Sequence, residues 1–280
     1  MLRTSGIQAA VLAALCANFY SWAVFGGETN TVPADEKKAP AAETPGGEKE
    51  RQPMFADAFD KDLSNWQAEG PHLVEVKDGR LRVKTTEDAR KVGEYVWLKQ
   101  DLPKDFRVEF DFTPVSESGF FLLFFCAAGT KGEDILSKEL FEDYMPYKSW
   151  KPYQDFDKYT SPPDRRTDKR INCYHISYRR NTMANCNLRK NPGQNLMKSS
   201  DIKALLPAGK VAHVELTKEA AHITLKVNGE LFMDYTDDGK LNGGVYGAGK
   251  FGFRQVYESE GYYDNFRVYD LASPEAREQK

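Results

Sequence analysis

The chain has 280 residues, and its 42 acidic and 39 basic residues leave a formal net charge of −3. A balance this close to neutral argues against generic nucleic-acid binding, because domains that bind nucleic acid carry a marked basic excess. The four cysteines and four histidines show no CxxC or Cys/His spacing typical of zinc. We therefore predict no metal and no cofactor, and leave a structural calcium ion open.

The first 26 residues have the layout of a secretory signal peptide. Arg3 is the single early cation, an apolar run rich in Ala, Leu and Val follows, and small residues offer cleavage after Ala23 or Gly26. An uncleaved anchor is the alternative, because about 20 mostly apolar residues can just span a bilayer. Both versions predict an exported protein, periplasmic or extracellular, which would touch a membrane only through a retained N-terminal segment.

Residues 27–53 combine Pro, Gly, Ala, Glu and Lys with almost no large apolar side chain. Such a segment buries too little surface to offset its ordering entropy, so we predict a disordered linker. The remaining residues 54–271 have the length of one β-sandwich domain, and 272–280 form a C-terminal tail.

Alternating apolar and polar residues, bounded by turn dipeptides, recur through this domain and indicate half-buried strands. The segments HLVEVK-DG-RLRVK (72–84) and HITLKV-NG-ELFMDY (222–235) are predicted hairpins, because DG and NG accept the positive φ angles of a two-residue turn. The run GFFLLFFCAAG (119–129) is so continuously apolar that both its faces should be covered. Further strands are expected at 94–102, 106–115, 249–256 and 262–271.

The number of these strands and the lack of a fixed repeat favour an all-β fold, with two antiparallel sheets packed face to face as a sandwich. An up-and-down barrel is the alternative. Minor short helices are expected at 133–143 and 201–206. A sheet face crossed by loops is then the expected binding surface.

The segment YHISYRRNTMANCNLRKNPG (174–193) holds the candidate binding surface. Strand side chains alternate, so a hairpin that pairs 175 with 189 and 177 with 187 gathers the polar side chains on one face. These are His175, Ser177, Arg179, Asn185, Asn187, Arg189 and Asn191, opposite the apolar Tyr174, Ile176, Tyr178 and Leu188. His, Arg and Asn suit sugar hydroxyls and carboxylates, whereas a merely solvated face is the alternative.

The same register bears on the cysteines. It places Cys173 on the polar face and Cys186 on the apolar face, so a disulfide between them requires a bulge or another pairing. With Cys126 as the third cysteine left after signal cleavage, at least one thiol stays unpaired.

Charge and aromatic residues point to the kind of ligand. Residues 165–190 carry one acidic residue, Asp168, against Arg165, Arg166, Lys169, Arg170, Arg179, Arg180, Arg189 and Lys190, so an anionic ligand is favoured. Aromatic residues stand at every third position from 141 to 159, a spacing that matches polyproline II. Trp150, Tyr147 and Tyr153 are candidates for stacking on sugar rings, with packing of a long loop as the alternative. Arg254, in GKFGFRQV, completes the candidate substrate-binding residues.

With these motifs in view, the chain resembles the YesU-like bacterial family over roughly 55–271. The segments Tyr174-His175-Ile176-Ser177-Tyr178 and Asn187-Leu188-Arg189-Lys190-Asn191 are the most specific part of the resemblance. It implies a sandwich of the concanavalin A-like lectin/glucanase fold (a jelly roll) and a setting in bacterial polysaccharide utilisation. It supports the fold more than the chemistry, and the segment 141–163 looks longer than expected for the family.

Three hypotheses for the chemistry remain. A retaining glycosidase needs two carboxylates about 5 Å apart; Glu109 and Asp111 suggest such a pair, but position 113 is Thr, which favours an ordinary amphipathic strand. A polysaccharide lyase needs a base, an acid and a group that neutralises a uronic carboxylate.

For a lyase, His175 is the candidate base, and Arg179, Arg189 or Asn187 the neutraliser. Tyr147 or Tyr153 would be the acid. The third hypothesis is a non-catalytic, lectin-like module that uses the same face. We predict an exported carbohydrate-active protein that acts on an acidic polysaccharide or its oligosaccharides, as a lyase or glycoside hydrolase, with the binding module as the alternative.

Overall fold

The computed structural model describes residues 51–70, 72–85, 93–117, 119–137, 171–179, 185–203 and 206–272. These residues form fifteen strands and no helix. In chain order the strands are β1 (Phe55–Asp57), β2 (Trp66–Glu69), β3 (Leu73–Lys77), β4 (Arg80–Lys84), β5 (Glu94–Leu98), β6 (Phe106–Pro114), β7 (Phe120–Gly129), β8 (Ile171–Arg179), β9 (Asn185–Asn191), β10 (Asn195–Lys203), β11 (Ala212–Glu219), β12 (His222–Val227), β13 (Glu230–Thr236), β14 (Lys250–Val256) and β15 (Glu260–Asp270).

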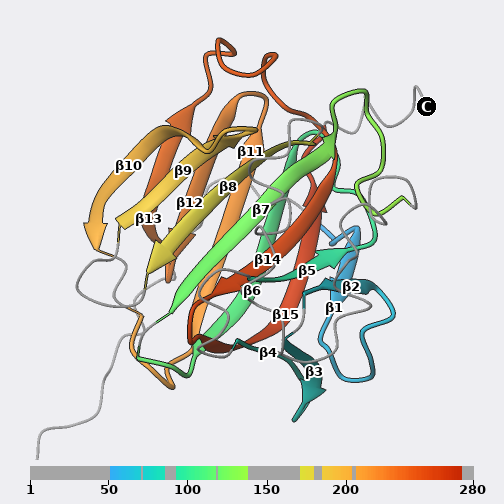
Figure 1. Cartoon of the computed structure of the whole chain (residues 1–280), viewed down its shortest axis with the longest axis vertical. Helices are drawn as coiled ribbons and strands as arrows, with labels where there is room; N and C mark the ends of the chain where they lie inside the picture. The colour runs from blue at the N-terminus through green and yellow to red at the C-terminus, as the bar shows by residue number, and fades with distance from the viewer. Residues whose placement is uncertain are drawn as a thin grey trace, which may run out of the picture. The chain divides into compact units, whose positions relative to one another are not determined.

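The strands pair into two antiparallel sheets, which Figure 1 shows as two layers. One sheet has eight strands, in the order β13-β12-β11-β6-β15-β4-β3, with β1 paired to β15. The other has seven strands, in the order β10-β9-β8-β7-β14-β5-β2. This is the predicted two-sheet sandwich, so the barrel alternative was wrong.

The core lies between the sheets and is built from alternate residues of each strand. On β6, Val108, Phe110 and Phe112 are fully buried, and they face Phe253 of β14 across the sandwich. The rings of Phe110 and Phe253 meet edge to face, with centroids 5.1 Å apart. Each such side chain contributes about 1.5–3 kcal/mol by leaving water, so this layer dominates the stability of the fold.

The seven-stranded sheet also buries its second face, the one turned away from the core. Leu122 and Phe124 of β7 pack there with Tyr95 and Trp97 of β5, in a cluster separate from the main core. Phe121, Leu123 and Phe125 of the same strand β7 belong to the main core. The prediction that 119–129 is covered on both faces is confirmed.

Both predicted hairpins are present. Asp78 and Gly79 join β3 to β4 with φ angles of 53° and 67°, and Asn228 and Gly229 join β12 to β13 with φ angles of 51° and 80°. Positive φ at both central residues is the geometry that suits the right-handed twist of paired strands. The local turn chemistry therefore sets these two registers.

The predicted helix at 201–206 was wrong. Residues 201–203 continue β10 and pair with β9, where Lys203 lies opposite Asn185. The sheet hydrogen bonds outweigh the helix propensity of this segment, because a helix of about six residues is marginal by itself. Of the helix expected at 133–143, the described part 133–137 is a turn, in which the Leu136 amide donates to the Asp134 carboxylate at 2.8 Å. An Asp side chain that bonds the backbone in this way favours turns over helix interiors.

Cys126, Cys173 and Cys186 are buried and form no disulfide with one another. Cys186 points into the main core, while Cys173 lies in the cluster on the other face of the sheet, as the predicted register requires. Burial raises the pKa of Cys126 and of Cys186 to about 12. These two thiols therefore stay protonated and unreactive at neutral pH. Within the described ranges, nothing long, helical and apolar enough to cross a membrane occurs.

Candidate functional site

The predicted register of the β8–β9 hairpin is confirmed. His175 lies opposite Arg189, Ser177 opposite Asn187, and Cys173 opposite Asn191. Tyr174, Ile176 and Leu188 point into the main core. The polar side chains at 175, 177, 187, 189 and 191 therefore share the face that is turned away from the core.

Neighbouring strands extend this face across the sheet. Arg254 on β14 lies opposite Leu122 of β7 and Tyr95 of β5, and Leu122 lies opposite Ser177. We name this surface the His175 face. Its described members are Glu69, Tyr95, Trp97, Leu122, Phe124, Cys173, His175, Ser177, Asn187, Arg189, Asn191 and Arg254.

Some predicted site residues fall elsewhere. Arg179 and Asn185 belong to β8 and β9, but their side chains lie outside the described part of the structure. Tyr147, Trp150 and Tyr153 lie outside the described residues altogether. The structure thus brings together His175, Ser177, Asn187, Arg189, Asn191 and Arg254 from the predicted set.

The floor of the His175 face is a continuous row of aromatic rings. Tyr95 and Trp97 stack with centroids 5.4 Å apart, and both meet the edge of Phe124. Phe124 in turn stacks on the imidazole of His175, at 5.0 Å and an interplanar angle of 17°. Sequence reasoning missed these three aromatic residues. Tyr95 and Trp97 alternate with core residues along β5, and Phe124 does so along β7. This alternation is the signal that could have placed them on the face opposite the core.

Gly252 of β14 makes room for this row. A Cβ atom placed on Gly252 would lie 2.5 Å from the Trp97 ring, closer than van der Waals contact allows. The indole therefore lies directly on the β14 backbone. Its Nε1 donates a hydrogen bond of 2.8 Å to the carboxylate of Glu69, which orients the ring at the β2 edge of the face.

Arg254 provides a buried cation. Its side chain is 3% exposed, and its guanidinium lies 4.9 Å from the centre of the Tyr95 ring. A Cβ on Gly93 would stand 2.8 Å from the Arg254 Nε, so this glycine leaves space for the guanidinium. A guanidinium can bind an anionic group through charge-assisted hydrogen bonds.

His175 is held by Asn191. The Asn191 Nδ2 lies 2.8 Å from the His175 Nδ1, and both side chains are buried, at 0% and 2% exposure. The same amide nitrogen lies 3.4 Å from the carbonyl oxygen of Cys173. The imidazole is therefore fixed both at its edge, by Asn191, and on its face, by Phe124.

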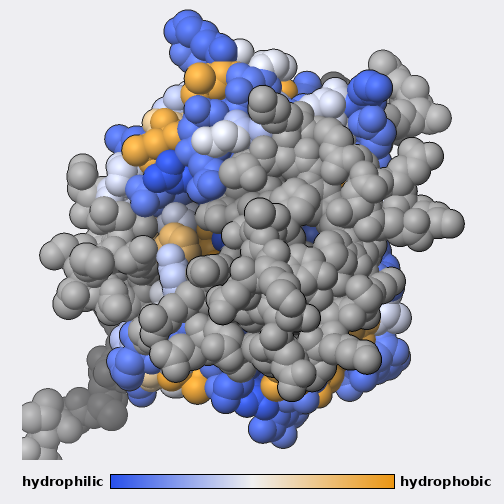
Figure 2. Space-filling model, in the orientation of Figure 1, coloured by the Kyte–Doolittle hydropathy of each residue, from blue (hydrophilic) through white to orange (hydrophobic). Residues whose placement is uncertain are grey.

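Exposure varies across the hairpin. Ser177, like His175, is buried, so neither side chain faces open solvent. Asn187 and Arg189 on β9 are half-buried, and Arg189 donates a hydrogen bond of 2.7 Å to the carbonyl of Gln194. In Figure 2, hydrophilic side chains with some hydrophobic ones among them gather over the end of the sheet that holds β9 and β10. The β9 side is thus the more accessible edge of the site.

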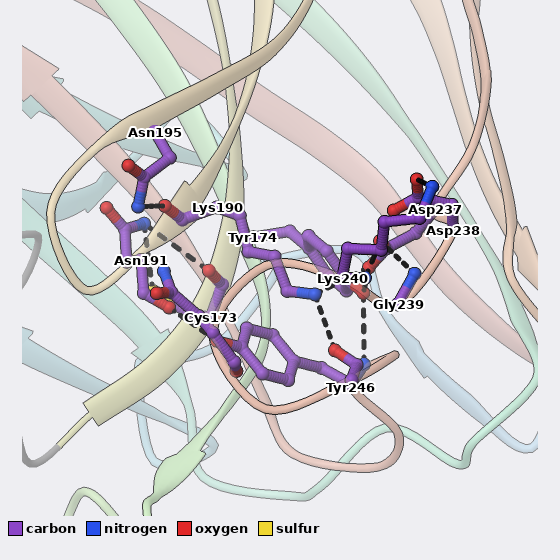
Figure 3. Close-up of polar contacts among 12 residues, drawn as sticks. Cys173, Tyr174, Lys190, Asn191, Asn195, Asp237, Asp238, Gly239, Lys240 and Tyr246 are labelled. Carbon is purple, nitrogen blue, oxygen red and sulfur yellow. Dashed lines mark hydrogen bonds and ion pairs between the residues drawn. The ribbon is translucent and has the colours of Figure 1, made fainter.

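Lys190 was predicted to add positive charge to the site, and this prediction was wrong. Its ammonium group points into the interior, where it contacts the Asp237 carboxylate at 2.8 Å with side-chain exposures of 0% and 1% (Figure 3). Tyr174 donates a 2.5 Å hydrogen bond to the same carboxylate oxygen. Lys190 therefore neutralises an internal carboxylate and offers no charge to a ligand. The predicted cations at 165–170 and at 180 lie outside the described residues.

This internal network ties the two sheets together at the hairpin. Asp237 follows β13 of the eight-stranded sheet, whereas Lys190 and Tyr174 belong to the seven-stranded sheet. Tyr246 adds to it, because its amide donates to the Tyr174 hydroxyl at 3.0 Å and its own hydroxyl donates to the Asn191 carbonyl. Burial opposes ionisation of Asp237, but the hydrogen bonds from Lys190 and Tyr174 outweigh it and lower the pKa of this carboxyl.

The carboxylates of the glycosidase hypothesis lie on the other sheet. Glu109 and Asp111 project from the outer face of β6, and Asp111 contacts His213 at 2.9 Å and accepts a hydrogen bond from Asn265. They lie on the opposite sheet from the His175 face and cannot act together with it. Their alternation with buried residues is the pattern of an amphipathic strand. Over the described ranges, no group of three or more His, Cys, Asp or Glu side chains could hold a metal ion.

The fold and this face define a two-sheet antiparallel sandwich whose seven-stranded sheet carries a buried polar and aromatic surface. A family model described as a domain of unknown function (DUF1961) matches residues 54–268, and the chain belongs to this family. The uncharacterized protein YesU of Bacillus subtilis (strain 168) is 28% identical over 216 residues, which cover 74% of this chain and 90% of YesU. The predicted resemblance to YesU is confirmed.

Solved structures agree on the fold. A Bacillus subtilis protein of unknown function with a galectin-like fold is 25% identical, with a TM-score of 0.64, and the match covers 78% of this chain and 95% of that one. SCLam, a non-specific endo-β-1,3(4)-glucanase of family GH16, is 12% identical with a TM-score of 0.50 over 79% of this chain and 92% of its own. The second likeness shows the fold alone.

Proposed function

We propose that the chain is an exported protein that binds an acidic saccharide on the His175 face. One observation carries the proposal: on the outer face of one sheet, buried hydrogen-bonding groups and a buried arginine stand on a floor of aromatic rings. The outer face of a sandwich sheet is normally solvated, so groups of these kinds buried there are expected to serve recognition. The galectin-like fold of a 25% identical protein and the glucanase fold of SCLam agree with a saccharide ligand.

The side chains fit a sugar acid. Arg254 and Arg189 bring two guanidinium groups to the face, and a guanidinium can bind a carboxylate through two parallel hydrogen bonds. His175, Ser177 and Asn187 add groups that pair with hydroxyls. Glu69, at the far edge, is bonded to Trp97 and takes no part in binding the anion.

The basis for export is the N-terminal sequence. One cation, an apolar run and small residues follow one another in residues 1–26, which is the layout of a signal peptide. Export agrees with a protein that binds polysaccharide fragments outside the cytoplasm. Expression with residues 1–26 intact, followed by fractionation and mass determination of the mature chain, tests it; a full-length cytoplasmic product would contradict export.

Binding is tested with matched ligands. We expect oligomers of polygalacturonate, alginate or ulvan to bind, and their carboxyl-reduced forms to bind at least about tenfold more weakly, because a hydrogen-bonded charge is lost. Arg254→Met should remove this difference, whereas Arg267→Met on the eight-stranded sheet should leave it intact. Calorimetric titration measures both. Equal affinity for acidic and carboxyl-reduced forms would overturn the acidic ligand.

The same panel separates binding from catalysis. Reducing ends and ultraviolet absorbance are followed with each polymer, because hydrolysis raises the first alone and lyase cleavage raises both. Binding without either signal is the result that the geometry favours, since the carboxylate pair of β6 lies on the other sheet. A rise in absorbance that His175→Gln abolishes would instead establish the lyase.

A further inference from the structure

Two polar side chains of β9 keep hydrogen-bonding groups that the described residues do not use. Arg189 makes one hydrogen bond, from its Nη1 to the Gln194 carbonyl at 2.7 Å, and the Asn187 amide makes none within the described part of the chain. Both side chains are half-buried, whereas His175 and Ser177 on the neighbouring strand β8 are buried. The unused groups of β9 therefore lie where a ligand can reach them.

The contact with Gln194 leaves one edge of the Arg189 guanidinium complete. The Nε and Nη2 donors stand side by side on this edge, and the hydrogen bond from Nη1 uses neither of them. Two parallel N–H donors match the two oxygens of a carboxylate, which they bind through a pair of charge-assisted hydrogen bonds. A planar carboxylate is therefore the group that this edge fits.

The turn after β9 holds the Gln194 carbonyl in place. Asn195 donates from its Nδ2 to the Lys190 carbonyl at 3.5 Å (Figure 3) and to the Pro192 carbonyl at 3.0 Å. The Nδ2 of Asn242, in the loop after β13, donates to the same Pro192 carbonyl at 2.8 Å. The guanidinium is thereby ordered before a ligand arrives, which lowers the entropic cost of binding.

The edge strand β10 extends the same face. Leu196 lies opposite Arg189, and Ser199 lies opposite Asn187. Residues directly opposite on paired strands project to the same face, so the four side chains are neighbours. Ser199 is exposed, and Leu196 is 52% exposed. An apolar side chain beside polar donors suits a sugar ring, which presents C–H groups next to its hydroxyls.

The dimensions of this group of side chains correspond to one sugar ring. Asn187 and Arg189 are two residues apart on one strand, which separates their Cα atoms by about 7 Å, and β10 lies about 5 Å from β9. A single pyranose unit spans such an area, so one unit can contact both strands.

We propose that the edge of the His175 face holds a subsite for one uronic acid unit, formed by Asn187, Arg189, Leu196 and Ser199. Arg189 binds the carboxylate through Nε and Nη2. Asn187 and Ser199 pair with hydroxyls, and Leu196 contacts the C–H groups of the ring. The β9–β10 subsite deepens, and rests on, the acidic-saccharide function proposed above, and it adds Leu196 and Ser199 to the binding residues.

The carboxylate contact is tested by calorimetric titration with oligomers of polygalacturonate, alginate and ulvan and with their carboxyl-reduced forms. Arg189→Lys keeps the charge but loses the paired donors, so acidic oligomers should bind about tenfold more weakly and reduced forms within about twofold of wild type. Lys198→Met is the control, because it removes an exposed cation from β10, and it should change affinity by less than about threefold. Wild-type affinity in Arg189→Lys, or an equal loss in Lys198→Met, would overturn the carboxylate contact.

The apolar contact predicts a different pattern. Leu196→Asn should weaken acidic and carboxyl-reduced oligomers by the same factor, about threefold, because contact with C–H groups does not depend on the charge of the ligand. Leu231→Asn changes an exposed leucine on β13 of the other sheet and should leave both affinities unchanged. Unchanged affinity in Leu196→Asn, or a loss confined to the acidic oligomers, would overturn the role of Leu196.

A spectroscopic measurement separates the subsite from the function on which it rests. In full-chain protein labelled with ¹⁵N-arginine, Arg189→Lys identifies the Arg189 Nε–H signal by its loss. We expect acidic oligomers to shift this signal and carboxyl-reduced oligomers to leave it in place. Binding of acidic oligomers with an unmoved Arg189 signal would overturn the subsite and leave the saccharide function standing. Failure of every oligomer to bind the wild-type protein would overturn both.

Discussion

The outer faces of the two sheets differ in kind, although both belong to antiparallel strands of one sandwich. On the eight-stranded sheet, β6 alternates strictly between buried and half-buried residues, and its outward side chains form ion pairs such as Asp111 with His213. On the seven-stranded sheet, β5 and β14 are buried at every position. A face that is open to solvent needs only polar side chains. A sheet that is buried on both faces must instead provide a hydrogen-bond partner for each polar group it contains. The second face therefore carries the specific contacts of the molecule.

The largest expected effect tests whether the His175 face is a packed layer. Phe124→Ala removes a fully buried ring that contacts Tyr95, Trp97 and His175, and should lower the free energy of unfolding by about 3–5 kcal/mol. Glu215→Ala on the eight-stranded sheet removes a 3.1 Å ion pair with Lys226 and should cost about 0–1 kcal/mol. Urea unfolding measures both. A loss below about 1 kcal/mol for Phe124→Ala would mean that this face is not packed.

A similar loss of folding stability is expected on the core side of the β8–β9 hairpin. Asp237→Asn leaves the buried Lys190 ammonium without its counter-charge and should cost about 3–5 kcal/mol. The neighbouring Asp238 forms an exposed pair with Lys240, so Asp238→Asn should change stability by about 0–1 kcal/mol. Equal effects of the two adjacent substitutions in urea unfolding would contradict the internal ion pair.

Gly252 of β14 lies beneath the Trp97 ring of the His175 face. Gly252→Ala places a methyl group 2.5 Å from the Trp97 ring and should cost about 1–3 kcal/mol through overpacking. Gly247→Ala is the control, because a Cβ there meets its nearest atom at 3.7 Å. Thermal unfolding and tryptophan fluorescence follow the change. A Trp97 emission and stability identical to wild type would show that the indole does not rest on β14.

The last prediction concerns the pH dependence of stability. Glu94, at the start of β5, has its pKa raised well above the usual range, chiefly by burial. Its folded form keeps the proton while the unfolded form releases it, so the free energy of unfolding should fall as pH rises above the ordinary pKa of 4.5, by at most about 1.4 kcal/mol per pH unit. Glu94→Gln cannot ionise and should flatten this dependence between about pH 4.5 and 7. Parallel curves for the two proteins would contradict the shift.

Sequence reasoning recovered the part of the site that lies on one hairpin. His175, Ser177, Asn187, Arg189 and Asn191 follow from strand parity and one register, because alternation is a local property of the backbone. Tyr95, Trp97 and Phe124 were missed, although alternation placed them correctly, since their role depends on strands that are neighbours only in the folded sheet. Lys190 was counted toward a ligand because its partner, Asp237, lies 47 residues away in the chain.

The sequence by itself determined strands β3 to β9 and β12 to β15, the two short hairpins, the sandwich class and the direction of the described side chains of the β8–β9 hairpin. These follow from alternation and turn chemistry between near neighbours. Only the tertiary structure decided which outer face is buried and that Lys190 is neutralised inside the molecule. Only it placed the Asn191 amide between the Cys173 carbonyl and the imidazole of His175. These outcomes depend on pairings between distant segments, and a local pattern contains no information about which distant group will complete a buried charge or hydrogen bond.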